Sequence, residues 1–119
     1  MLDEKRKYVR VKADIEFIYK PRSSKDPEKK GVTENISPCG IMGLVDKGVK
    51  TSDWLELKLH MPRLRTPIPA TGKVVWTTEG KAGKIKAGIK FEEINPEMKN
   101  KFLESMCELM FSELERLNI

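Results

Sequence analysis

The first part of the chain alternates between apolar and charged residues, and this alternation restricts the fold more than any other feature. From Val9 to Tyr19 an apolar or aromatic residue stands at every second position, and Arg10, Lys12, Asp14 and Glu16 stand between them. A period of two is that of a β-strand with one face buried and one face in water. We therefore expect one long, half-buried strand over residues 9–19.

Shorter segments with apolar or alternating residues follow. They cover residues 32–36, 40–45, 54–61, 68–78 and 85–91. The polar segment 20–31 contains two prolines and predicts a loop, and residues 79–83 predict a hairpin connection. In the segment 68–78, the alternation places Val74 and Trp76 on one face and Val75 on the other. Strands at such even spacing predict a small antiparallel barrel.

The period changes after the last predicted strand. Asn95, Pro96 and Glu97 form a typical helix start, with an N-cap residue, a proline at the first helical position and a carboxylate in the first turn. A broad stripe at helical spacing follows it: Met98, Phe102, Met106, Leu109, Met110, Glu113 and Leu117. We expect this helix to cap the open end of the barrel. The alternative is that it extends to a partner protein or to a second copy of the chain.

Length and composition predict one domain in a reducing compartment. The chain has 119 residues, a net charge of +5 and two distant cysteines, Cys39 and Cys107. The length fits a single core, and the cysteine spacing fits neither a disulfide framework nor a zinc site. No apolar run is long enough for a membrane span or a signal peptide, so we expect a cytoplasmic protein without membrane insertion. The positive charge favours an anionic partner.

Catalytic and metal-binding patterns are lacking in the sequence. The single histidine, His60, falls on the polar side of a predicted strand, where a solvated side chain is expected. One histidine cannot supply a metal site, and no serine–histidine–acid set can be assembled around it. We therefore expect no enzyme activity, no catalytic residues, no metal and no cofactor.

Two short motifs carry the functional information. Arg6 and Arg10 stand four positions apart before the first predicted strand, and Asn35, Ser37 and Gly40 follow in and after the second. The planar guanidinium group of arginine matches phosphate oxygens and the O6/N7 edge of guanine. Asn35 and Ser37 are two positions apart, so they share one side of an extended segment. Gly40 closes a turn in which glycine permits a positive φ, and it lets a flat base approach the backbone.

This pair of motifs resembles the signature of the PilZ domain family, bacterial receptors for cyclic di-GMP. The family pattern is RxxxR followed by (D/N)x(S/A)xxG, and the chain has RKYVR at 6–10 and NISPCG at 35–40. Residues 72–76 and 88–91 are similar to the family's closing strands. The resemblance implies a six-stranded antiparallel β-barrel (11–93) with a C-terminal amphipathic helix (95–118), preceded by a mobile binding arm (1–10).

The resemblance also implies roles for these residues. Arg6 and Arg10 would clasp guanine and phosphate groups, Asn35 and Ser37 would bind the second side of cyclic di-GMP, and Gly40 would admit the ligand. Lys5 would be a further phosphate contact. For Trp54 and Trp76, stacking on a guanine is one option, and a position in the core or at the barrel rim is the one we expect.

The expected function is therefore a stand-alone receptor in bacterial second-messenger signalling, which regulates motility or biofilm formation. The ligand would order the N-terminal arm over the barrel, and output would pass to an unidentified effector protein. Self-association through the C-terminal helix is also open. The alternative is a PilZ-like interaction module that binds no nucleotide. Binding of nucleic acid is disfavoured because aromatic residues make up only 7% of the chain.

Overall fold

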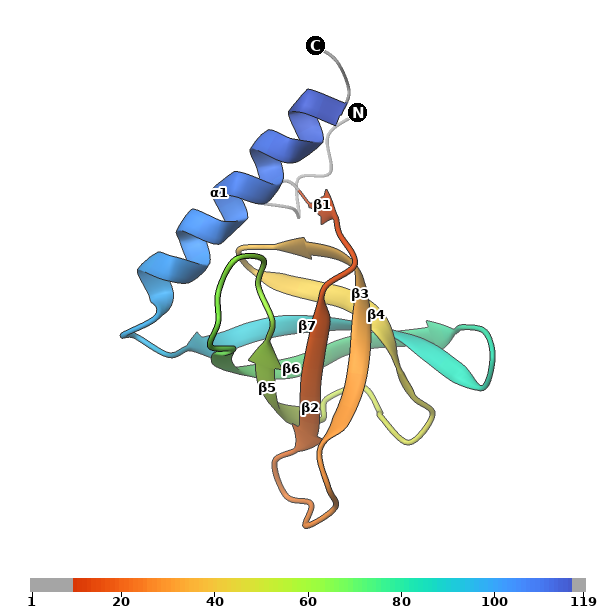
Figure 1. The fold of residues 1–119 in the computed structure, drawn as a ribbon. Coiled ribbons are helices and arrows are strands. Elements are labelled where there is room, and N and C mark those ends of the chain that lie inside the picture. The colour runs from red at the N-terminus through yellow and green to blue at the C-terminus, as the bar shows by residue number, and fades with distance from the viewer. Residues whose placement is uncertain (1–9, 117–119) are drawn as a thin grey trace.

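A closed antiparallel β-barrel with one helix forms the computed structural model, which describes residues 10–116 (Figure 1). The elements in chain order are β1 (Val11–Lys12), β2 (Glu16–Pro21), β3 (Lys29–Ser37), β4 (Gly40–Asp46), β5 (Trp54–Leu59), β6 (Ile68–Glu79), β7 (Lys84–Ile94) and α1 (Lys99–Arg116). Strands β2, β5, β6, β7, β4 and β3 pair in that order, and β3 pairs back with β2. The expected six-stranded barrel with a C-terminal helix is confirmed, and β1 is an additional short strand.

Strand β3 closes the barrel and has the most pairing partners. On one edge it pairs with β4, and on the other it pairs with β2 near its start and with β1 near its end. β1 and β2 thus lie one after the other along the same edge of β3. The segment between β3 and its neighbour β2 is shorter than expected, because β2 reaches Pro21 and β3 begins at Lys29.

The prediction of one continuous strand over residues 9–19 is wrong in the middle. The pairing stops between Lys12 and Glu16, where the side chain of Thr33 takes part in the hydrogen bonding. The Thr33 hydroxyl donates to the carbonyl oxygen of Ala13 at 2.5 Å and accepts from the amide of Ile15 at 2.9 Å. A buried threonine thus satisfies two backbone groups that a regular ladder would have paired with backbone. Val9 lies outside the described residues.

The alternation correctly predicts which side chains form the core. Leu55, Leu57, Leu59 and Met61 are all buried, as expected for one face of the segment 54–61. From the first segment, Val11, Ile15, Phe17 and Tyr19 are buried as well. The ring of Phe17 lies close to Gly43, where a Cβ would also come within 2.7 Å of the carbonyl oxygen of Val32. This contact explains the glycine in the apolar segment 40–45.

A β-bulge overturns the prediction that Val74 and Trp76 share a face. Val74 pairs with Ile89 and lies in the core, whereas Trp76 pairs with Gly88, the next residue along β7. Val75 is therefore the extra residue of a bulge, and an extra residue reverses the alternation beyond it. Trp76 lies on the outer surface of the barrel, half-buried rather than in the core.

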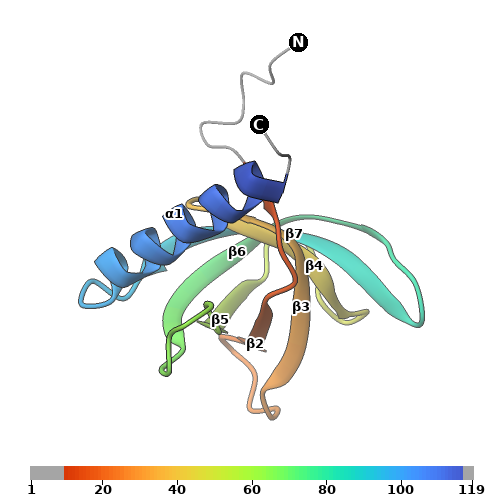
Figure 2. The ribbon, with the colours of Figure 1, turned by 45° about the horizontal axis from the view of Figure 1, so that its top comes forward.

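Helix α1 begins later than expected and covers one end of the barrel (Figures 1 and 2). Asn95 Oδ1 accepts from the amide of Glu97 at 2.9 Å, and the Asn95 carbonyl oxygen accepts from the amide of Met98. Residues 96–98 form a turn, so the prediction that Pro96 starts the helix is wrong. Residues 117–118, at the predicted end, lie outside the described residues.

The first half of α1 packs on the barrel and its second half is exposed. Phe102 and Met106 are buried in the core, and the rings of Phe91 and Phe102 meet edge to face with centroids 5.7 Å apart. Farther along, α1 carries exposed apolar side chains, among them Phe111 and Leu114. Both figures show this second half beside β1. Between residues 10 and 116 there is no helix with the length and apolar character of a membrane span.

Candidate functional site

Asn35 and Ser37 lie on the face of β3 that points away from the core, at the end where β3 turns into β4. Ile36 between them is fully buried in the core, so its two neighbours point outward. Asn35 pairs with Met42 and Ser37 pairs with Gly40 across the hairpin. The prediction that the two polar residues share one side of an extended segment is confirmed.

Ser37 has a local structural role in addition to its place in the motif. Its Oγ accepts a hydrogen bond from the amide of Cys39 at 3.1 Å, which stabilises the two-residue turn at Pro38 and Cys39. The side chain is almost fully buried. The hydroxyl proton of Ser37 is left to donate to another group.

Asn35 holds an unsatisfied polar atom. Its Oδ1 is buried and has no hydrogen-bond partner among the described residues. A buried acceptor without a partner costs about 1–3 kcal/mol, so most such atoms in folded proteins have a hydrogen-bond partner.

The positive φ expected at Gly40 is wrong, whereas the expected role of Gly40 in admitting a ligand stays a prediction. Within the described chain, Gly83 is the only glycine with a positive φ, so Gly40 does not need one. A Cβ at position 40 would instead collide with the carbonyl oxygen of Ile89 on β7. Gly40 is therefore required for the close approach of β4 to β7, and any space that it leaves for a ligand is a second role.

Arg10 directly precedes β1, and it is exposed. Val11 pairs with Ile36 and Lys12 with Asn35. Continuing this antiparallel register by one residue places Arg10 opposite Ser37. The fold thus brings Arg10, Asn35, Ser37 and Gly40 to one end of β3. Arg6 and Lys5 lie outside the described residues.

Trp76 is a neighbour of this site, and it lies on the outer face, which the alternation did not predict. One row of paired residues crosses four neighbouring strands: Asn35 on β3, Met42 on β4, Gly88 on β7 and Trp76 on β6. The indole ring lies over Gly88, where a Cβ would collide with its Nε1. Gly88 is two strands from Asn35, about 10 Å at the usual strand spacing. The signal in the sequence was Gly88, since a glycine inside a strand often lies beneath a large neighbouring ring.

Trp54 lies farther around the barrel. It is on the outer surface of β5, with the guanidinium carbon of Arg22 5.1 Å and the Lys73 ammonium nitrogen 5.8 Å from its ring centroid. Trp54 pairs with Lys73 on β6, Lys73 pairs with Lys90 on β7, and Lys90 pairs with Gly40 on β4. The ring thus already packs against cations, and neither tryptophan lies in the core, which was one of the two positions expected from the sequence.

A charged cluster at the opposite end of β4 has a structural role. Asp46 forms ion pairs with Lys84 at 2.7 Å and with Lys29 at 3.0 Å. Hydrogen bonds from Lys84 and then Lys29 hold the pKa of Asp46 below its ordinary value, and the same bonds raise the pKa of both lysines. The amide of Asp46 donates to the hydroxyl of Tyr19 at 2.8 Å, and burial raises the pKa of that hydroxyl.

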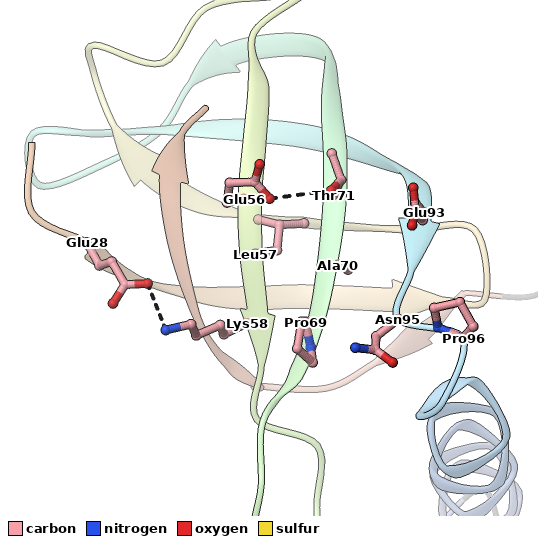
Figure 3. Close-up of a pocket in the computed structure, with 10 residues that line it drawn as sticks. All are labelled: Glu28, Glu56, Leu57, Lys58, Pro69, Ala70, Thr71, Glu93, Asn95 and Pro96. Carbon is pink, nitrogen blue, oxygen red and sulfur yellow. Dashed lines mark hydrogen bonds and ion pairs between the residues drawn. The ribbon is translucent and has the colours of Figure 1, made fainter. Parts of the chain in front are cut away.

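A groove of about 270 Å³ is lined mainly by residues of β5 and β6, and no motif residue lines it (Figure 3). Glu28, Glu56 and Glu93 line it, and Lys58 is paired with Glu28 at 3.1 Å. This excess of carboxylates disfavours an anionic ligand. Across residues 10–116, no three side chains of the metal-binding types gather at one place, and His60 is exposed, as predicted.

Solved structures share this fold at low sequence identity. The inhibitor of motility MotI/DgrA from Bacillus subtilis matches with a TM-score of 0.73 and 21% identity, over 93% of this chain and 54% of that protein. The chain thus spans about half of that relative. The PilZ domain of YcgR from Escherichia coli, solved with cyclic di-GMP, matches with a TM-score of 0.72 and 11% identity, over 97% of this chain and 98% of that one.

A third structure and a sequence-family comparison complete these findings. The PilZ domain of CeSA, from a cellulose-synthesising bacterium, matches with a TM-score of 0.59 and 14% identity, over 87% of this chain and 96% of that domain. No curated protein sequence matches the chain. The family model of the PilZ domain matches residues 4–108, a range that includes both halves of the motif. The chain belongs to the PilZ domain family.

Proposed function

We propose that this chain is a receptor for cyclic di-GMP that has no catalytic activity of its own. The observation that carries the proposal is the convergence of Arg10, Asn35 and Ser37 at one end of β3, although Arg10 and Asn35 are 25 positions apart in the sequence. The membership in the PilZ family and the cyclic di-GMP complex of the YcgR domain support it.

Each motif residue has a chemical role in this proposal. Arg10 and Arg6 bind phosphate oxygens and the O6/N7 edge of a guanine, with Lys5 as an additional cation for a phosphate. The buried Oδ1 of Asn35 accepts from a guanine N–H group, and the Ser37 hydroxyl donates to the ligand. Trp76, half-buried on the same side of the barrel, offers its ring for stacking.

Isothermal titration of the protein with cyclic di-GMP tests the proposal. The wild-type chain should bind, and Arg10→Ala should weaken binding by about 2 kcal/mol or more, roughly thirtyfold in Kd, because a bidentate, charge-assisted contact is lost. The matched control is Arg65→Ala, since Arg65 is an exposed arginine outside the motif. Folded wild-type protein that releases no heat with cyclic di-GMP would refute the receptor function.

Signal output in this proposal passes to a partner protein in the cytoplasm. Ligand binding orders the arm that precedes β1, and β1 contacts α1, whose second half presents exposed apolar side chains. Those side chains are available to an effector or to a second copy of the chain.

The alternative is an interaction module that ignores nucleotide, and the exposed residues Leu103, Phe111 and Leu114 favour it. An affinity purification with and without cyclic di-GMP separates the two functions. A partner set that changes with the ligand supports the receptor, and an unchanged set supports the module.

A further inference from the structure

Helix α1 carries a second apolar stripe that does not contact the barrel. The residues that α1 buries against the barrel are Phe102, Ser105 and Met106. The second stripe consists of Leu103, Cys107, Met110 and Leu114, and all four side chains are exposed. Leu114 is 53% exposed and Leu103 is 40% exposed. Side chains of this kind gain free energy when another surface covers them.

The two stripes point in different directions from the helix axis. At 100° per residue, the exposed stripe lies about 120° around the helix from the buried stripe. A second helix can therefore lie along the exposed stripe while the barrel stays on the far side of α1. Beside Met110 and Leu114, Phe111 widens the apolar surface, with 66% of its own area exposed.

The spacing of the stripe is that of a two-stranded coiled coil. Leu103, Cys107, Met110 and Leu114 are separated by four, three and four positions, which is the alternation of d and a positions with a mean period of 3.5 residues. In this register Asn100 also occupies an a position, and it is exposed. A single asparagine at an a position specifies a two-stranded arrangement in which it faces its own counterpart.

Charge favours a parallel pair of identical helices. In this register Lys99 occupies a g position and Glu104 the following e position, and these two positions face each other across a parallel pair. Neither residue forms an ion pair with another residue between 10 and 116. In an antiparallel pair that sets Leu103 opposite Leu114, Glu104 would face Phe111 instead of Lys99, and Asn100 would no longer face its own counterpart.

We propose that α1 pairs in parallel with α1 of a second copy of this chain, through Leu103, Cys107, Met110 and Leu114. The contact covers about two heptads, so the dimer is weak and its population depends on protein concentration. This proposal does not depend on ligand binding. A chain that binds no cyclic di-GMP would dimerise equally.

Sedimentation equilibrium of the full chain tests the contact. The wild-type protein should show a monomer–dimer equilibrium, and Leu114→Lys should weaken it at least about tenfold, because it places an ammonium group in the apolar seam. Ser112→Lys adds the same charge about 180° around the helix from Leu103, and it should leave the equilibrium unchanged. Both residues are exposed, so both variants should fold.

Two results would overturn the contact. One is a wild-type protein that stays monomeric at every concentration. The other is a dimer that Ser112→Lys weakens as much as Leu114→Lys does. Arg10→Ala should dimerise like the wild type, so loss of nucleotide binding and loss of dimerisation can be told apart.

Disulfide trapping tests the orientation of the helices. In a Cys39→Ala background, Cys107 should oxidise to a disulfide with Cys107 of the second copy. After Cys107→Ala is added, Leu103→Cys and Leu114→Cys are prepared as single-cysteine proteins and mixed. A parallel pair gives 103–103 and 114–114 disulfides, whereas predominance of the mixed 103–114 species would overturn the parallel arrangement.

Discussion

At the scale of single residues, the two motifs combine ligand-binding and structural roles. The Ser37 hydroxyl stabilises its own turn, and Gly40 permits β4 to approach the Ile89 carbonyl. Arg10 and the Oδ1 of Asn35, by contrast, have no hydrogen-bond partner among the described residues. Loss of function after substitution therefore has two physical origins, and only measurements of stability and affinity together separate them.

Gly40→Ala should destabilise the fold as well as reduce binding. The new Cβ meets a backbone carbonyl that cannot move away like a flexible side chain, and overpacking of this kind costs about 1–3 kcal/mol. Urea denaturation measures the loss. Gly48→Ala is the matched control, since a Cβ there has no neighbour within 4 Å, and it should change the free energy of unfolding little. Unchanged stability of Gly40→Ala with lost binding would instead assign Gly40 to the ligand.

The sequence could place the motif residues but not explain all of them. The motif spacing identified Asn35, Ser37 and Gly40, and the alternation put Asn35 and Ser37 on one side of a strand. The clash at Gly40 depends on β7, which lies about 50 residues away in the chain, and no local pattern contains that contact. The outward face of Trp76 could not be predicted for the same reason, because it depends on the pairing with Gly88.

At the scale of elements, the period of the hydrophobic pattern predicted the strands and failed where hydrogen bonding becomes irregular. The register shifts between Thr33 and Asn35, between Thr71 and Gly72, and between Val74 and Trp76. A bulge is a mismatch between two strands, so neither strand reveals it alone. The helix stripe was read as one broad face, and its division into a buried and an exposed part depends on where the barrel ends.

The ion pairs of Asp46 should make the connection of β3, β4 and β7 sensitive to acid. The pKa of Asp46 is lowered in the folded chain, so its contribution to stability is fully present above the ordinary value of 3.8 and is lost as the pH falls through the folded pKa. The difference in unfolding free energy between wild type and Asp46→Asn should be constant at neutral pH and shrink below about pH 4.

Urea denaturation at several pH values measures this difference. Asp14→Asn serves as a control, because Asp14 is exposed and makes no ion pair with the described residues. If Asp46→Asn keeps a constant difference from wild type down to the lowest pH at which both fold, the ion pairs do not contribute as argued.

At the scale of the whole molecule, the closed barrel supports the site from both sides. β3 is fixed by β4 on one edge and by β1 and β2 on the other, whereas Arg10 belongs to the segment that leads into β1. A ligand that binds both Arg10 and β3 connects the segment before β1 to the strand with the most pairing partners. Binding should therefore stabilise the folded state as a unit.

Cyclic di-GMP should raise the melting temperature of the wild-type chain. A ligand at 100 times its Kd adds about 2.7 kcal/mol to the unfolding free energy, which corresponds to about 10 °C or more for a domain of this size. Thermal unfolding followed by circular dichroism measures the shift. Arg10→Ala at the same ligand concentration should show little change, and an equal shift in that variant would mean that the ligand binds elsewhere.

Because the barrel closes only when β7 pairs with β4, the binding site should form late during protein synthesis. The motif residues leave the ribosome early, but β4 pairs with β7, which ends at Ile94, and β3 closes on β4. A nascent chain that ends before Lys84 carries every motif residue and still lacks β7, the strand against which Gly40 packs. Competence to bind should therefore arise in one late step of translation, when the last strand enters the barrel.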